Sequence, residues 1–321
     1  MDEADMRLLY YLDLDSRSPV KKLAHLSRMK PEKAEARLRY FFENNIVKRC
    51  YPELNRAKLG CHPFKVYVQF QDMPAYKLDE VYQFLASMPN IGWVAECSGI
   101  WDMIFAIWAK SVQEFNRSYE EFLGRYHEFV LKKVTSITVE YYVSNKKWLD
   151  GDDQKGIVVK GGGIPQDMVE EADARILRAL AKDSRSSSLV LSDKTGIDAN
   201  DIDARIKKME KEGVIIAFQT DLNLNAFNRS LCKAFIYLTK SSKAEEERLL
   251  DYCFRHPEIT AVVKCVGPWD MEIEAHSKSF NDFTEMMNDI RNRYPTLIRN
   301  YEGVVINKES GTMYRVNPHK Q

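Results

Sequence analysis

The sequence predicts an α+β fold in which one chain carries the same unit twice, each unit a small helical domain followed by a sheet domain. Ten of the seventeen residues at 3–19 recur at 171–187, at a fixed offset of 168. The offset persists further on, since segment 97–103 (CSGIWDM) returns as 265–271 (CVGPWDM). In each unit the apolar spacing also changes from helical to strand-like after about sixty residues. These observations predict a tandem duplication.

Composition is typical of a globular protein that folds in water. The chain has 321 residues, 45% of them hydrophobic, and no apolar run approaches the length of a membrane span. The N-terminus begins with Asp2, Glu3 and Asp5 instead of a basic segment, so we expect no signal peptide and a cytoplasmic location. The six cysteines show no Cys-x-x-Cys spacing, which favours reduced thiols.

Net charge is zero, but the two units differ. Residues 1–58 contain 13 Lys and Arg against 9 Asp and Glu, a balance of +4. The equivalent residues 169–226 contain 9 against 11, a balance of −2. A polyanionic partner would therefore meet two unequal surfaces.

The helical domain is clearest in the second unit. Apolar spacing predicts a helix around Ile176–Leu180, a short helix over 189–194 and a third over 199–212. Gly196 suits a left-handed C-cap, and Asp198 is placed to cap the third helix. Residues 214–223 then alternate like a strand pair or wing.

The first unit repeats this plan, with Pro31 in the first turn of its third helix. In a helix-turn-helix the second helix of the pair enters the DNA major groove, so its exposed side chains decide what it contacts. The alternative is an ordinary solvated helix face. The candidate DNA-binding residues are Arg28, Lys30, Lys33, Arg37 and Arg39 in the first unit, and Arg205, Lys207, Lys208 and Lys211 in the more acidic second unit.

The remaining residues of each unit read strand, helix, strand, strand, helix, strand. This order predicts a four-stranded antiparallel sheet with both helices on one face, a ferredoxin-like arrangement. The other face is rich in apolar residues, so the two sheets could cover each other. In the second unit the strand 271–277 alternates, and its polar side, with Glu272, Glu274 and His276, is either solvated or paired with basic groups across an interface.

A Gly-x-Trp-Asp turn joins the middle strands of each sheet. An ordinary hairpin explains it, since Gly supplies positive φ and Asp bonds the backbone. The functional alternative is a carboxylate and a tight turn that hold the ammonium group of a small ligand. The candidate ligand-binding residues are Gly99, Trp101, Asp102, Gly267, Trp269 and Asp270.

Residues 171–215 (EADARILRALAKDSRSSSLVLSDKTGIDANDIDARIKKMEKEGVI) resemble the DNA-binding domain of the Lrp/AsnC family, and VGPWDMEI at 266–273 resembles the turn of its ligand-sensing RAM domain. The resemblance implies winged helix-turn-helix domains, dimerisation through facing RAM sheets and modulation by amino acids or other small metabolites. Arg37 and Arg205 match the arginine of the family's third helix. The chain departs from the family in fusing two units, and in having Asn45 where the second unit has Gly213. Its first unit also lacks the Gly-Ile turn.

The expected domains follow from this resemblance. They are a winged helix-turn-helix at 1–60, a RAM domain at 61–145, a flexible linker at 146–168, a second winged helix-turn-helix at 169–228 and a second RAM domain at 229–316.

The leading functional hypothesis is a transcription regulator that binds double-stranded DNA in the nucleoid, at a non-palindromic operator. We expect no membrane partner, no catalytic residue, no metal and no cofactor. The RAM domains pair within the chain, or between chains in a homodimer or larger homo-oligomer. Two alternatives remain: an enzyme resembling the siroheme decarboxylases of the same fold, and a metabolite sensor without DNA binding.

Overall fold

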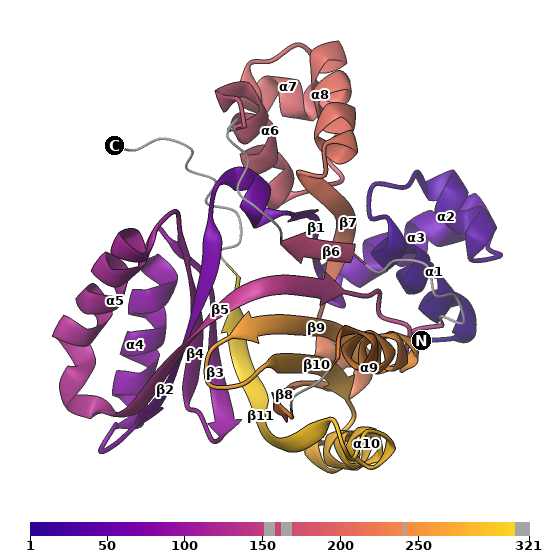
Figure 1. Ribbon diagram of the computed structural model, residues 1–321. Coiled ribbons are helices and arrows are strands. Elements are labelled where there is room, and N and C mark those ends of the chain that lie inside the picture. Colours follow the sequence, from indigo (N-terminus) through magenta and orange to yellow (C-terminus); the bar gives the residue numbers. More distant parts are fainter. Residues whose placement is uncertain (151–157, 162–168, 240–241, 312–321) are drawn as a thin grey trace.

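The structure is a computed structural model that describes residues 1–150, 158–161, 169–239 and 242–311. It confirms the α+β class, and the same order of elements occurs in its two halves (Figure 1). No helix in these ranges is both long and apolar enough to cross a membrane.

Each half begins with three helices and one strand, which we call a head. The first head comprises α1 (Glu3–Leu14), α2 (Val20–Leu26), α3 (Pro31–Glu43) and β1 (Val47–Leu54). The second comprises α6 (Glu171–Lys182), α7 (Ser188–Thr195), α8 (Ala199–Lys211) and β7 (Ile215–Leu222). Asp198 caps α8 by accepting a hydrogen bond from the Asn200 amide at 2.9 Å, as predicted.

The first head keeps its tight turns without glycine. Gly196 and Gly213 adopt φ of 69° in the second head. The equivalent Arg28 and Asn45 adopt φ of 57° and 52°. The left-handed region is disfavoured for a residue with a Cβ, and less so for Asn. The loss of glycine therefore strains these turns but does not remove them.

The wings differ from the prediction. Each head contributes a single strand, and β1 pairs antiparallel with β7 of the other head. A lone strand would leave its backbone N–H and C=O groups without hydrogen-bond partners, and the pairing of β1 with β7, which we call strand exchange, supplies those partners. Leu222 of β7 lies in the core of the first head, and Leu54 of β1 lies in the core of the second. Each head is thus completed by the other.

The two sheet domains have the predicted order of elements. The first contains β2 (His62–Phe70), α4 (Ala75–Ser87), β3 (Ile91–Gly99), β4 (Met103–Ala109), α5 (Val112–Tyr126) and β5 (Val130–Val143). The second contains β8 (Ser230–Leu238), α9 (Lys243–Arg255), β9 (Ile259–Val266), β10 (Met271–Ser277), α10 (Phe280–Arg293) and β11 (Ile298–Ser310).

The two sheets close into one barrel within the chain. β5 pairs with β9 and β11 pairs with β3, so the order is β2-β4-β3-β11-β8-β10-β9-β5 and returns to β2. The sheets therefore do more than face each other as predicted, because their edges also join and leave no unpaired edge between them. Helices α4 and α5 cover one side of the barrel, and α9 and α10 cover another (Figure 1).

Part of the expected linker is ordered. Lys146 bonds Asp13 of the first head at 2.6 Å, and Leu149 lies in the core of that head. Strand β6 (Val158–Gly161) pairs with β5 at the side of the barrel. Residues 151–157 and 162–168 of this linker lie outside the described ranges.

Candidate functional site: the heads and a charged pocket in the barrel

The two arginines matched to the family bind carboxylates of their own heads. Arg37 forms two hydrogen bonds of 2.7 Å with Asp5. Arg205 bonds Asp173 at 2.8 Å and Glu170 at 2.9 Å. The hydrogen bond that Arg205 donates to Asp173 is the main reason that the pKa of Arg205 is raised. Both arginines hold the third helix of a head against its first helix in this structure.

The other candidate residues of the first head remain at the surface. Helix α3 buries Ala34, Leu38 and Phe41, and at 100° per residue the opposite side carries positions 32, 36, 39 and 43. Arg39 is the one cation among these four, since Glu32 and Glu43 are acidic. Arg28, Lys30 and Lys33 are exposed near the start of the helix, where Lys33 lies 3.9 Å from Asp2.

The same side of α8 is more cationic than expected. Ile202, Ile206 and Met209 are buried, so positions 200, 204, 207 and 211 face outward. Lys207 and Lys211 are exposed there, and Lys208 beside them pairs with Glu170 at 3.3 Å. The acidic residues that make the second head negative therefore lie mainly elsewhere on it. These three lysines are the contacts that the sequence predicts for the second head.

A contact between the heads was missed at the sequence level. The Arg17 side chain donates to the carbonyls of Ser184 and Ser186, the second at 3.2 Å. Arg185 donates in the same way to the carbonyls of Ser16 and Ser18. The sequence Asp-Ser-Arg-Ser occurs in both units and was interpreted only as a turn. Its exact repetition is the feature of the sequence that could have indicated these reciprocal hydrogen bonds between the heads.

Both Gly-x-Trp-Asp turns have structural contacts. Asp102 accepts a hydrogen bond from the Phe70 amide and Asp270 from the Leu238 amide, each at 2.7 Å. The structure brings the two turns together, because the rings of Trp101 and Trp269 lie 6.2 Å apart and are each 2% exposed. Gly99 has φ of 135° as predicted, whereas its equivalent Gly267 does not have a positive φ, so the second turn forms without the left-handed conformation. These contacts are those of the hairpin alternative.

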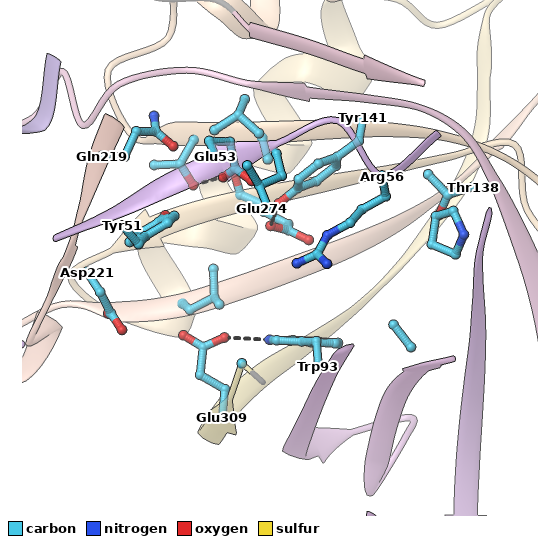
Figure 2. Close-up of a pocket in the computed structure, with 18 of the residues that line it drawn as sticks. Tyr51, Glu53, Arg56, Trp93, Thr138, Tyr141, Gln219, Asp221, Glu274 and Glu309 are labelled. Carbon is cyan, nitrogen blue, oxygen red and sulfur yellow. Dashed lines mark hydrogen bonds between the residues drawn. The ribbon is translucent and has the colours of Figure 1, made fainter. Parts of the chain in front are cut away.

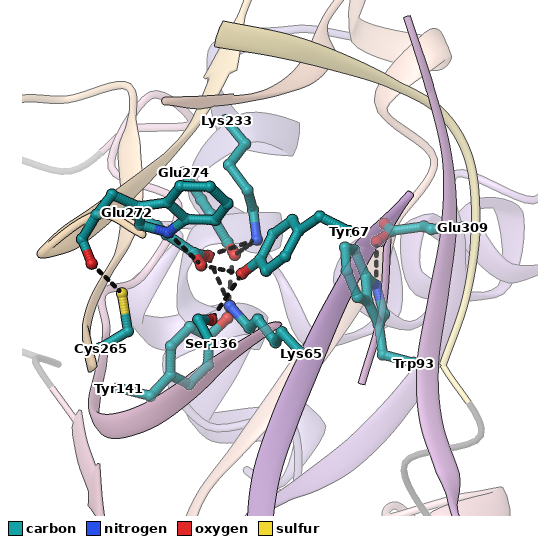
Figure 3. Close-up of polar contacts among 11 residues, drawn as sticks. Lys65, Tyr67, Trp93, Ser136, Tyr141, Lys233, Cys265, Glu272, Glu274 and Glu309 are labelled. Atoms are coloured by element: carbon teal, nitrogen blue, oxygen red, sulfur yellow. Dashed lines mark hydrogen bonds and ion pairs between the residues drawn. The ribbon is translucent and has the colours of Figure 1, made fainter. Parts of the chain in front are cut away.

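The barrel interior contains a buried charge network (Figure 3). Glu272 is fully buried and lies 2.7 Å from Lys65 and 3.0 Å from Lys233. Tyr67 also donates to Glu272, and Trp269 does so at 3.3 Å. The polar side of β10 is therefore paired with basic groups and is not solvated, which decides between the two alternatives that the sequence left open.

Electrostatic attraction favours the ionised forms of Glu272 and Lys233 in this network. Burial alone would raise the pKa of Glu272, but attraction to Lys233 and Lys65 outweighs it and lowers that pKa well below its usual value. Burial likewise opposes the charge of Lys233, yet Glu272 and Glu274 raise its pKa. For Lys65 burial is dominant and lowers the pKa.

The network is asymmetric although the fold repeats. Lys65 and Lys233 are equivalent by the offset of 168, whereas Glu272 is equivalent to Ile104. One carboxylate therefore serves two lysines from opposite halves. Glu274, which bonds Lys233 at 2.8 Å, replaces Ala106 in the same way.

A cavity of about 280 Å³ lies beside this network, between the barrel and the wing strands β1 and β7 (Figure 2). Trp93, Trp108 and Thr138 line it from the first half, and Glu274 and Glu309 from the second. Apart from the polar side of β10, sequence reasoning missed this pocket. Comparing the units position by position would have flagged it, since Trp108 is matched by His276 and Thr138 by Ile306.

Metal ligands do not gather in the part of the chain that the structure describes. No group of three or more His, Cys, Asp and Glu side chains there could hold a metal ion. The six cysteines are free, and five of them are buried.

Comparison with known proteins finds similarity to DNA-binding proteins, including over the second head. A family model described as winged helix-turn-helix DNA-binding matches residues 170–216. The HTH-type transcriptional regulator FL11 of Pyrococcus abyssi is 28% identical over 125 residues, which cover 38% of this chain and 82% of that protein. An uncharacterised HTH-type transcriptional regulator of Pyrococcus furiosus is 24% identical over 148 residues, 46% of this chain and 95% of that protein.

A solved structure shares the fold of almost the entire chain. The siroheme decarboxylase NirDL superposes with a TM-score of 0.63 at 12% identity, covering 96% of this chain and 92% of that chain. It has also been solved in complex with an iron-uroporphyrin III analogue. At this identity the likeness concerns the fold.

Proposed function

We propose that the protein is a DNA-binding transcriptional regulator of Lrp/AsnC type, in which one chain does the work of a dimer. The observation that carries this proposal is the pair of helix-turn-helix heads held together by strand exchange. The match of the second head to a DNA-binding family model and the relatives named HTH-type transcriptional regulators support it. Such a protein would act in the cytoplasm, at the nucleoid.

Fixed heads suit the geometry of a DNA duplex. A dimeric helix-turn-helix protein contacts half-sites about one helical turn apart, or a multiple of it, so the two recognition helices need a defined separation. The heads are connected rigidly by the β1–β7 pairing and by the hydrogen bonds that Arg17 and Arg185 each donate to backbone carbonyls of the other head. We infer that both heads bind one duplex together.

Exposed cations of both heads are the proposed phosphate contacts. Arg28, Lys30, Lys33 and Arg39 serve the first head, and Lys207, Lys208 and Lys211 serve the second. Arg37 and Arg205 act by positioning the third helices, because carboxylates already bind them. The outward sides of α3 and α8 differ in sequence, so we expect a non-palindromic operator. A homodimer or larger assembly of this pseudo-dimer is compatible with the proposal.

The test measures DNA affinity against salt for charge-reversed heads. We expect Lys33→Glu with Arg39→Glu, and separately Lys207→Glu with Lys211→Glu, to weaken binding at least tenfold and to reduce the salt slope by about 2. Lys243→Glu on α9, where the side chain is 88% exposed, is the control and should bind as the parent does. Salt-insensitive binding, or equal binding by all variants, would refute the proposal.

Tetrapyrrole decarboxylation is the competing function, favoured by the fold shared with siroheme decarboxylase over the whole chain. Against it stand the relatives named HTH-type transcriptional regulators, which are 24–28% identical to this chain where they match it, compared with 12% for the decarboxylase. Iron uroporphyrin III added to the protein distinguishes the two. A shifted Soret band that is lost in a pocket variant such as Thr138→Trp would favour the enzyme.

A further inference from the structure

The buried network places two equivalent lysines in different surroundings. Lys65 and Lys233 correspond by the offset of 168, and both lie beside Glu272 (Figure 3). Lys233 pairs with two carboxylates, Glu272 at 3.0 Å and Glu274 at 2.8 Å. Within the part of the chain that the structure describes, Lys65 pairs with one carboxylate, Glu272, at 2.7 Å. The duplication has therefore produced one lysine with two counter-ions and one lysine with a single counter-ion.

Lys65 also borders the cavity. Its side chain is 10% exposed, and it lines the cavity together with Trp93 and Tyr141. The Lys65 Nζ atom lies 6.0 Å from the centre of the Tyr141 ring. Lys233 borders the same cavity, but its side chain is only 1% exposed. Of the two amines, Lys65 is the one that a small molecule in the cavity can approach.

Burial and a second cation make Lys65 more reactive than an ordinary lysine. Desolvation is the largest influence on the pKa of Lys65 and lowers it, Glu272 opposes this, and the nearby charge of Lys233 lowers it further. A larger fraction of Lys65 is then the neutral amine, the form that attacks carbonyl carbons. For Lys233 the attraction of Glu272 and Glu274 outweighs burial and raises the pKa. Lys65 is therefore the stronger nucleophile of the two.

We propose that Lys65 is a covalent attachment site for a small aromatic aldehyde, which it binds as an imine in the cavity. The neutral amine attacks the carbonyl carbon to form the C–N bond, and an electron pair of the C=O bond moves to the oxygen. The resulting carbinolamine takes up one proton and loses water, which gives a protonated imine. Overall, an ammonium group and an aldehyde become an iminium group and water. Charge is conserved, and the step needs no oxidant or reductant.

Glu272 serves as the counter-ion of this adduct. The iminium nitrogen carries the same positive charge as the ammonium group that lies 2.7 Å from the carboxylate. The adduct therefore keeps the charge balance of the network, whereas an uncharged adduct such as an amide would leave Glu272 with Lys233 alone. Trp93, Trp108 and Tyr141 line the cavity and favour an aromatic ring over an aliphatic chain. The inference does not depend on DNA binding.

The experiment maps reductive labelling of the full chain at neutral pH. Benzaldehyde and pyridoxal are the probes, and sodium cyanoborohydride converts an imine into a stable secondary amine that peptide mass spectrometry locates. Lys243, whose side chain is 88% exposed, is the internal control for unselective reaction. We expect Lys65 to be labelled at least about tenfold more than Lys243, because its amine is more often neutral and the cavity holds the aldehyde beside it. Propanal should label Lys65 less than benzaldehyde does.

Two variants that keep the positive charge beside Glu272 separate the lysines. Without reductant, the visible absorbance of the pyridoxal imine should be lost in Lys65→Arg and kept in Lys233→Arg. In concentrated urea the preference for Lys65 in the unaltered chain should disappear, because the cavity is lost. The labelling map of the unaltered chain decides the question even where Lys65→Arg does not fold.

Three results would overturn the inference. They are equal labelling of Lys65 and Lys243, labelling of Lys233 in place of Lys65, and a preference for Lys65 that persists in urea. The last result would show that the reaction depends on local sequence and not on the cavity. Equal labelling of Lys65 by propanal and benzaldehyde would overturn the aromatic class of the aldehyde.

Discussion

His276 lies at the edge of the pocket with its ring held neutral. Trp148 donates to its Nδ1 at 3.2 Å. Burial first, and then the nearby Lys146, lower the pKa of His276 to about 3. The ordinary pKa of histidine is about 6.5, so the unfolded chain gains a proton at this residue well before the folded protein does.

Acid should therefore destabilise the fold through this residue. The stabilisation is fully present above the ordinary histidine pKa and falls by about 1.4 kcal/mol per pH unit below it. Between about pH 7 and about pH 5 we expect a loss of up to about 2 kcal/mol in the free energy of unfolding, measured by urea denaturation. Glu272 has a lowered pKa and stays ionised over this range.

His276→Gln is the comparison, because glutamine can accept from Trp148 and does not titrate. Its free energy of unfolding should change less with pH. Parallel pH profiles for the two proteins would show that His276 does not carry the effect.

Single residues were predicted unevenly from the sequence. Asp198, Gly196 and Pro31 were assigned correctly, since capping depends on neighbours within a few residues. The alternation of Glu272 and Glu274 predicted a polar side, but not Lys65 as a partner 207 positions away. Arg37 and Arg205 were expected to face DNA, and their bonds to the first helix were visible only once the helices were packed.

At the scale of elements, the wing strands distinguish this fold from two independent heads. Leu222 belongs to the second half by sequence but packs in the core of the first head, and Leu54 does the reverse. Both are nearly fully buried, at 3% and 1% exposed. Strand exchange thus couples the stability of each head to the other half of the chain.

We expect Leu222→Ala to destabilise the first head and Leu54→Ala the second, each by about 2–4 kcal/mol. Hydrogen exchange read by mass spectrometry should show faster exchange in α1–α3 for Leu222→Ala and in α6–α8 for Leu54→Ala. The two variants control for each other. If hydrogen exchange became faster only in the head to which the substituted residue belongs by sequence, the strand exchange between the heads would be contradicted.

Helices and strands were predicted well, and the pairing of strands was not. Helical periodicity and caps are local signals, so the three helices of each head followed from them. The partner of β1 lies 168 residues along the chain, and nothing local specifies it. Closure of the barrel depends in the same way on the edges of two sheets that meet only in the folded protein.

At the scale of the whole molecule, buried charges dictate how the halves combine. The barrel contains Lys65 from the first half, and Lys233, Glu272 and Glu274 from the second. A pair of first halves would bury two lysines beside Ile104 and Ala106, with no carboxylate from those positions. A pair of second halves would bury four carboxylates against two lysines. Uncompensated buried charge is strongly destabilising.

Separated halves should therefore associate with each other and not with themselves. We expect fragments 1–150 and 169–321, expressed together, to form a one-to-one complex in native mass spectrometry. Glu272→Ile with Glu274→Ala in the second fragment restores the residues found in the first half and should weaken the complex. Homodimers of either unaltered fragment in the mixture would contradict this expectation.

The exchanged strands also set an order for folding during synthesis. The core of the first head requires Leu222, which leaves the ribosome 168 residues after its counterpart Leu54. At about 5–20 residues per second this delay is on the order of 10–30 s. Throughout that interval the nascent first head has an incomplete core, and the amino-terminal domain matures only after most of the polypeptide has been made.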